Sequence, residues 1–160
     1  MIRTGNAKFM ISAWLFLAMV LSGGSVGAQQ QSEIDAVKTA NQAFYAALSA
    51  RDVAAMQKVW SSDADTQNIG PRDKAATIGW AAMKKRSAGA FDAFPELKVA
   101  MAETRIKIVG AVAWVSGIEQ MQRKDKAGGT SSGANLATNI FQKQGGRWLM
   151  VYHHASLMPQ

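Results

Sequence analysis

The chain has 160 residues, no cysteine and a formal net charge of +7. This length suits one domain with a hydrophobic core and is short for two, and packing must hold the fold because no disulfide can form. The densest basic runs, at 84–86 and 123–126, have no aromatic residues between their charges, which argues against a nucleic-acid-binding face and favours solvated surface charges.

The N-terminus has the pattern of a secretory signal peptide. Arg3 and Lys8 precede an apolar run at 9–21, and a small-residue tail ends at Ala28. A membrane anchor is the alternative, but a bilayer span needs roughly 20 apolar residues. We predict a signal peptide at 1–28, a mature domain at 29–160, and a periplasmic or secreted protein that does not stay in the membrane after cleavage.

Helical spacing begins shortly after this segment. Ser32-Glu33-Ile34-Asp35 resembles a capping box, and apolar residues recur at helical intervals up to Leu48, so we expect a first helix over about 33–50. Asp52 can cap a second, short helix whose apolar positions end at Trp60.

The following segment is polar and interrupted. Gly70-Pro71 blocks a continuing helix, which predicts a short strand and loop over 64–72. Asp73 can start a third helix that runs to about Ala90.

The second half of the chain changes to β periodicity. Apolar residues occupy one parity over 97–101 and the other over 104–108, and this change near Ala102-Glu103 predicts a β-bulge in a bent strand. A strand at 112–123 follows, and Gly145-Gly146 joins the two strands of a closing hairpin. Helices followed by a three- or four-stranded antiparallel meander predict an α+β fold.

Three segments carry a family resemblance. Residues 44–52 (FYAALSARD) and 59–64 (VWSSDA) resemble the opening of the superfamily of nuclear transport factor two, ketosteroid isomerase and the SnoaL-like polyketide cyclases. The run at 146–156 (GRWLMVYHHAS) is similar to its end, especially in the association domain of calcium/calmodulin-dependent kinase. The resemblance implies a cone-shaped, curved antiparallel sheet wrapped around a long N-terminal helix, two further helices, a cavity open at one end, and often a dimer.

The resemblance also permits a comparison with the isomerase site. The family's oxyanion-binding tyrosine matches Phe44, its general-base aspartate matches Asn68, and its protonated aspartate matches Asn139. Phe44 has no donor, and an amide such as that of Asn68 is not a useful base. Steroid isomerisation by that route is therefore not expected, although Tyr45 or a base elsewhere could support other chemistry.

Two adjacent histidines end the closing hairpin, and only one can face the cavity. Neighbours in a strand point to opposite faces, so His153 and His154 are separated by the sheet. If Gly145-Gly146 is a two-residue turn, Asn139 shares a face with His154. If the turn has three residues, Asn139 shares a face with His153.

The kinase association domain has a similar turn, and this favours the three-residue form and an inward His153. That domain places pocket arginines at the positions of Ala155 and Asn139, so this chain lacks both of them. An inward histidine suits general acid–base catalysis because its reference pKa is near 6.5. The alternative is a histidine satisfied by backbone or by a subunit partner.

The candidate residues form two groups. The catalytic candidates are His153, Glu119 and Asp63; Glu119 qualifies only if it faces inward, and Asp63 could instead cap or bond a loop. The ligand-binding candidates are Phe44, Tyr45, Trp60, Asn68, Trp80, Trp114, Asn139 and His153. Core packing is the alternative explanation for the tryptophans. We predict neither a metal site nor a cofactor, since two histidines on opposite faces supply metal ligands poorly.

Three functions remain open at this point. The leading one is an exported, dimeric cone domain that binds a small, largely apolar molecule. The second is an enzyme of isomerase, cyclase or dehydratase type with His153, Glu119 or Asp63 as its base. The third is a non-catalytic dimerisation or accessory module whose convex sheet face, with Tyr152 and His154, is the working surface.

Overall fold

A computed structural model describes residues 23–158 of the chain. The chain divides into two units, Met1–Ser32 and Glu33–Gln160. Residues 1–22 of the predicted signal peptide lie outside the described residues, and cleavage before Gln29 stays a prediction. Within residues 23–158, no helix combines the length and hydropathy that a membrane span requires.

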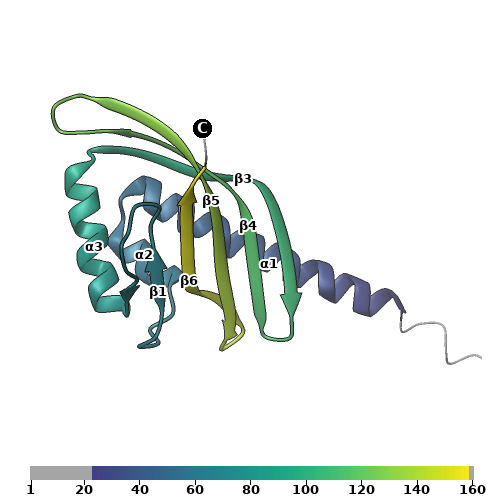
Figure 1. Cartoon of the computed structure of the whole chain (residues 1–160). Helices are drawn as coiled ribbons and strands as arrows, with labels where there is room; N and C mark the ends of the chain where they lie inside the picture. The colour runs from purple at the N-terminus through teal and green to yellow at the C-terminus, as the bar shows by residue number, and fades with distance from the viewer. Residues whose placement is uncertain (1–22, 159–160) are drawn as a thin grey trace, which may run out of the picture. The chain divides into compact units, whose positions relative to one another are not determined.

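The second unit is an α+β domain, as predicted. The helices are α1 (Gly23–Ala50, which starts in the first unit), α2 (Val53–Val59) and α3 (Trp80–Ala93). The strands are β1 (Gln67–Ile69), β2 (Thr77–Ile78), β3 (Glu96–Val109), β4 (Val112–Lys124), β5 (Thr130–Gln144) and β6 (Arg147–Leu157). They form one curved sheet in the order β2-β1-β6-β5-β4-β3 (Figure 1).

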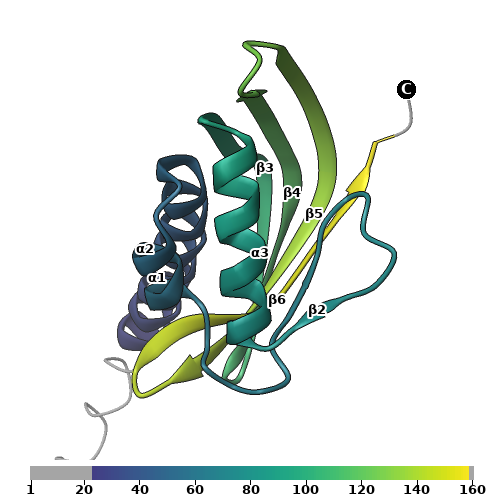
Figure 2. The same ribbon diagram turned by 90° about the vertical axis from the view of Figure 1, so that its left-hand side faces the viewer.

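The predicted antiparallel meander consists of β3 to β6, each paired with the next. The short strand β1 extends the sheet by pairing in parallel with β6, and β2 pairs with β1. The helices cover one face of this sheet (Figure 2). The core lies between them and includes Val37 and Phe44 of α1, Met83 of α3, Val115 of β4 and Phe141 of β5.

Two predicted helix starts were wrong. Helix α1 begins at Gly23 rather than near residue 33, because the alanine and glutamines of 28–31 continue the helix through the expected cap. Helix α3 begins at Trp80 rather than Asp73. The Asp73 carboxylate instead accepts a hydrogen bond from the Gly70 amide at 2.6 Å and pairs with Arg86 at 2.8 Å.

The start of the second helix and the bulge in the first long strand are confirmed. Asp52 caps α2 by accepting bonds from the amides of Ala54 and Ala55. The register of β3 against β4 shifts between Ala102 and Arg105, and Glu103 takes a left-handed φ of 51°. This extra residue bends the strand and allows the sheet to curve around the core.

The closing hairpin combines a turn and a bulge. Gln144 pairs with Arg147, so the turn has two residues, with φ of 54° at Gly145 and 79° at Gly146. The expected three-residue turn is therefore wrong. A second register shift between Ile140 and Phe141 leaves Val151 as an extra residue.

That bulge decides which histidine faces inward. The extra residue reverses the parity set by the turn, so Asn139 pairs with His153. His153 is buried and His154 is exposed. The inward orientation of His153 is confirmed, for a reason different from the one expected.

The geometry of the Gly145-Gly146 turn can be tested by adding a single methyl group as a Cβ. Gly146→Ala should lower the free energy of unfolding by about 1–2 kcal/mol, because a Cβ disfavours the left-handed backbone. No atom lies within 4 Å of the added Cβ, so the loss would come from backbone conformation alone. Urea denaturation measures the change.

Gly133→Ala in β5 is the matched control. Its added Cβ also meets nothing within 4 Å, and its backbone is an extended strand, so its stability should stay equal or rise slightly. Equal losses for both variants would contradict the turn geometry.

Candidate active site

A buried polar network lies on the inner face of the sheet where α1 crosses it. Its members, each at most 5 % exposed, are Asn41 and Tyr45 of α1, Glu119 of β4, Asn135 and Asn139 of β5, and His153 of β6. Strand pairing brings these together, since Asn135 lies opposite Glu119 and Asn139 lies opposite His153. Buried polar groups cost free energy unless they are hydrogen-bonded, so their partners are informative.

Asn139 is the centre of the network. Its amide nitrogen donates to Asn41 Oδ1 at 2.7 Å and to the Tyr45 hydroxyl at 3.3 Å. Its carbonyl oxygen lies 2.6 Å from His153 Nδ1. Because that oxygen can only accept, His153 Nδ1 carries a proton, and Nε2 of the neutral ring has a free lone pair.

Glu119 is the least satisfied member. Its Oε1 accepts a bond from the Asn135 amide at 3.1 Å. Its Oε2 lies 3.8 Å from His153 Nε2, which is too long for a hydrogen bond. Among the residues that the structure describes, this buried oxygen has no hydrogen-bond partner.

Burial shifts the pKa values of the titratable groups in this network in the directions that favour their uncharged forms. Desolvation raises the pKa of Glu119, although bonds from Asn135 and Tyr45 oppose the shift. Desolvation, together with the nearby His154 and Arg86, lowers the pKa of His153 to about 4. Burial and the neighbouring Glu119 raise the pKa of Tyr45. Near neutral pH, His153 is therefore neutral and Tyr45 keeps its proton.

Two cavities flank the network. The side cavity, about 390 Å³, lies between α1 and strands β3 and β4 and has Asn41 and Tyr45 in its wall. The mouth pocket, about 570 Å³, lies between the loop at 71–73, helix α3 and the ends of β4, β5 and β6, and it has Asn135 in its wall. The network thus has a member at each cavity, and a ligand in either one would meet a polar group.

Most of the predicted site residues lie together. The Phe44 ring centroid lies 5.2 Å from that of His153 and 6.0 Å from that of Trp60. Asn68 pairs with His153 across β1 and β6. Trp80 is half-buried and packs against the core, as its alternative explanation held.

Two predicted residues lie away from the network. Trp114 is 40 % exposed on the outer face, because its neighbours Ala113 and Val115 point inward. Asp63 is exposed and accepts a bond from Gln144 at 2.6 Å beside the hairpin turn, which fits the loop-bonding alternative. Glu119 faces inward, as its candidacy required.

Sequence reasoning missed Asn41 and Asn135. Asn41 lies one helical turn before Phe44 and Tyr45, on the face that the apolar spacing had already assigned to the core. Asn135 has the same strand parity as Asn139. The helical spacing of Asn41 and the strand parity of Asn135 could have identified them. Neither pattern, however, names the partner that makes a buried asparagine part of a site.

A family model described as a SnoaL-like domain matches residues 37–160. Curated protein sequences gave no significant match.

Solved structures share the cone fold over most of the chain. A candidate dehydratase of the NTF2-like family from Streptomyces avermitilis is 18% identical with a TM-score of 0.74, over 81% of this chain and 99% of that chain. A candidate calcium/calmodulin-dependent protein kinase type II association domain from Thiobacillus denitrificans is 28% identical with a TM-score of 0.64, over 76% and 94%. A ketosteroid isomerase-like protein from Erwinia carotovora atroseptica is 18% identical with a TM-score of 0.68, over 80% and 98%. The predicted resemblance is confirmed for the fold.

The burial of His153 predicts an acid-sensitive stability. As pH falls from 6.5 to about 4, the unfolded chain gains a proton on this residue that the folded protein cannot take up. This group alone should therefore reduce the free energy of unfolding by on the order of 3 kcal/mol over that window. His153→Asn does not titrate and can still donate to Asn139, so its stability deficit relative to wild type should shrink toward pH 4.

Urea denaturation at pH 7 and pH 4.5 measures this change. His154→Asn on the exposed outer face is the matched control. A deficit that shrinks as much in the control would contradict the assignment to His153.

The raised pKa of Glu119 predicts the opposite pH dependence of the unfolding free energy. Its pKa is raised in the folded protein, so its contribution to stability is fully present below pH 4.5 and is lost as pH rises through the folded pKa. Glu119→Gln should therefore become more stable relative to wild type as pH rises. A difference in unfolding free energy that stays constant between pH 4 and pH 9 would contradict the raised pKa.

Proposed function

This chain belongs to the SnoaL-like domain family, and we propose that it is an enzyme that moves a proton on a small, largely apolar substrate, in a reaction of isomerase, cyclase or dehydratase type. Glu119 is the proposed acid–base group. Tyr45 is the proposed hydrogen-bond donor to a substrate oxygen. His153 and Asn139 hold these two groups in place.

The unpartnered Oε2 of Glu119 is the observation that carries this proposal. Native cores pair nearly all of their buried polar atoms. A carboxylate oxygen left free in a network of six polar residues costs stability, and functional sites are where such costs are retained. A raised pKa also brings a carboxyl group closer to the pH at which it can both give and take a proton.

Tyr45 complements Glu119. Its hydroxyl oxygen accepts a bond from Asn139, and its own proton interacts with the Glu119 carboxyl group. A bound substrate oxygen would replace Glu119 as the acceptor of that proton. The raised pKa of Tyr45 keeps that proton in place. A substrate carbonyl or hydroxyl oxygen bound at Tyr45 would bring the neighbouring carbon toward Glu119, and charge that develops on the oxygen would be stabilised by the hydroxyl.

This arrangement differs from the isomerase site at every compared position. Phe44, Asn68 and Asn139 replace the three family residues, while the carboxylate and the phenol are supplied by Glu119 and Tyr45 instead. The proposed chemistry therefore uses other positions of the same cone. The dehydratase description of the Streptomyces avermitilis protein is compatible with this chemistry, and its identity supports the fold alone.

Ligand binding without chemistry is the second candidate. The side chains of Glu119 and His153 are each only 7% exposed, and the side cavity is lined by apolar groups such as Val99, Ile106 and Val115. A carrier protein needs only this apolar space. The polar network would then only hold the helix and the strands in fixed positions. For either function, we also propose that residues 1–28 direct export and that the domain forms a homodimer.

Deuterium exchange separates the two functions. The protein is incubated in D₂O with a panel of small hydrophobic ketones and β-hydroxyketones, and loss of protons next to the carbonyl, or loss of water, is followed by proton NMR. At least one compound that binds should react in the presence of wild type. Glu119→Gln should slow that reaction by about 10²-fold or more, because general acid–base catalysis contributes 10²–10⁴-fold, with binding unchanged.

Two further variants sharpen the result. Tyr45→Phe should slow the same reaction while the fold is retained. Glu103→Gln makes the same change at an exposed position on the β3 bulge, and it should react like wild type. If compounds bind wild type tightly but undergo neither proton exchange nor elimination, the result would contradict the enzymatic proposal and favour ligand binding without chemistry.

A further inference from the structure

The mouth pocket contains a concentration of cationic side chains from separate elements. Its wall includes Arg72 from the loop before β2, Arg86 from α3 and Arg123 from β4. Asp73 is the one carboxylate among its lining residues. These arginines occupy positions other than the two that the kinase association domain uses, so they were not anticipated from the resemblance.

The pocket keeps an excess of positive charge. The Asp73 carboxylate pairs with Arg86 at 2.8 Å and also accepts from the Gly70 amide at 2.6 Å, so it neutralises Arg86. Among residues 23–158, neither Arg72 nor Arg123 forms an ion pair. Within the part of the chain that the structure describes, two guanidinium groups of the mouth pocket therefore have no anionic partner.

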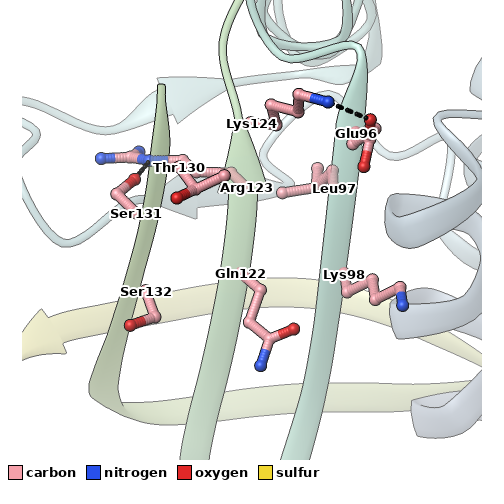
Figure 3. A pocket seen from close by; sticks show the side chains of 9 residues that line it. All are labelled: Glu96, Leu97, Lys98, Gln122, Arg123, Lys124, Thr130, Ser131 and Ser132. Atoms are coloured by element: carbon pink, nitrogen blue, oxygen red, sulfur yellow. Dashed lines mark hydrogen bonds and ion pairs between the residues drawn. The ribbon is translucent and has the colours of Figure 1, made fainter. Parts of the chain in front are cut away.

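Arg123 is held in a defined position. Its Nε donates to Ser131 Oγ at 2.9 Å, across from β4 to β5 (Figure 3). Its guanidinium carbon lies 4.7 Å from the centroid of the Phe94 ring at the end of α3. These two contacts leave the terminal nitrogens free, and a fixed guanidinium fork matches the geometry of a carboxylate.

The same pocket also has an apolar side. Met121, Leu157 and Met158 lie in its wall, and Leu157 is 50% exposed although its strand neighbour Ala155 is buried. Together these three side chains give the pocket an apolar wall. The pocket thus combines unpaired cations with an apolar surface.

Strand register connects the pocket to the proposed acid–base group. Arg123, Met121 and Glu119 follow one another on the inner face of β4, opposite Ser131, Gly133 and Asn135 of β5. Arg123 and Glu119 are four residues apart, roughly 13 Å along an extended strand. The mouth also influences the network directly, since Arg86 and Asp73 both act on the pKa of His153.

We propose that the mouth pocket binds an amphipathic organic acid, with its carboxylate between Arg123 and Arg72 and its apolar body against Met121 and Leu157. The apolar body points along β4 toward Glu119. The binding site stands on the contacts above, whereas the statement that this acid is the substrate rests on the proposed function.

Isothermal titration calorimetry on protein purified from cells that express the full chain tests the proposal. The probes are 2-naphthoate, its neutral analogue 2-naphthamide, and inorganic phosphate. We expect 2-naphthoate to bind at least tenfold more tightly than 2-naphthamide, and its affinity to fall as salt is added. Equal affinities for the acid and the amide, or tighter binding of phosphate than of 2-naphthoate, would overturn the proposal.

Variants locate the site. Arg123→Gln should weaken 2-naphthoate binding by tenfold or more and leave 2-naphthamide binding within twofold. Arg72 is exposed, so Arg72→Gln should keep the fold and weaken the acid at least threefold. This keeps the test valid if the loss of the Phe94 contact unfolds the Arg123 variant. Arg147→Gln removes the same charge at the hairpin turn and should change nothing. Equal effects of Arg72→Gln and Arg147→Gln would contradict the site.

The outcome is distinguishable from that of the proposed function. Glu119→Gln should bind 2-naphthoate as tightly as wild type does. If the arginine variants weaken the acid and no compound undergoes proton exchange, the binding site stands and the enzymatic proposal fails. If neutral ketones exchange protons at Glu119 and 2-naphthoate does not bind, the enzymatic proposal stands and this inference fails.

Discussion

The hydrogen bonds of Asn139 are the interaction on which the rest of the domain depends. One buried amide joins the central helix to two strands, because it contacts Asn41 and Tyr45 on α1 and His153 on β6. The Asn139 carbonyl oxygen fixes the tautomer of His153. The Nε2 atom that faces the unpartnered Oε2 of Glu119 is therefore the unprotonated one. An apolar residue at position 139 would leave three buried groups without their partner, a cost of about 1–3 kcal/mol for each.

Two single-residue bulges give the sheet its useful shape. The one at Glu103 bends β3, and the one at Val151 turns Asn139 and His153 to the same face. The polar network is therefore a product of irregular pairing. In a sheet with regular pairing after a two-residue turn, His154 would point inward and His153 would be on the outer surface.

Burial and charge are divided between the two parts of the site. The network at Glu119 is buried and favours neutral groups, whereas the mouth pocket carries the guanidinium groups of Arg72 and Arg123, which form no ion pair within residues 23–158. The carboxylate of Asp73 contributes to this division, because its bonds to Gly70 and Arg86 keep it away from Arg123. A low-dielectric interior next to a cationic entrance is an arrangement in which an acid with an apolar body can be held by one end and presented by the other.

Local sequence patterns were enough to predict the fold class, the order of the main elements, the cap at Asp52 and the bulge near Glu103, because helical spacing, strand parity and capping chemistry are local properties of the chain. The sequence also identified Glu119, His153, Asn139 and Tyr45 as candidates. Three further facts required the folded chain: the face that His153 occupies, the place of Asn135 and Asn41 in the network, and the pocket that Arg72, Arg86 and Arg123 share. These facts depend on register between strands and on packing between segments far apart in sequence, and one extra residue in β6 is enough to reverse a parity argument.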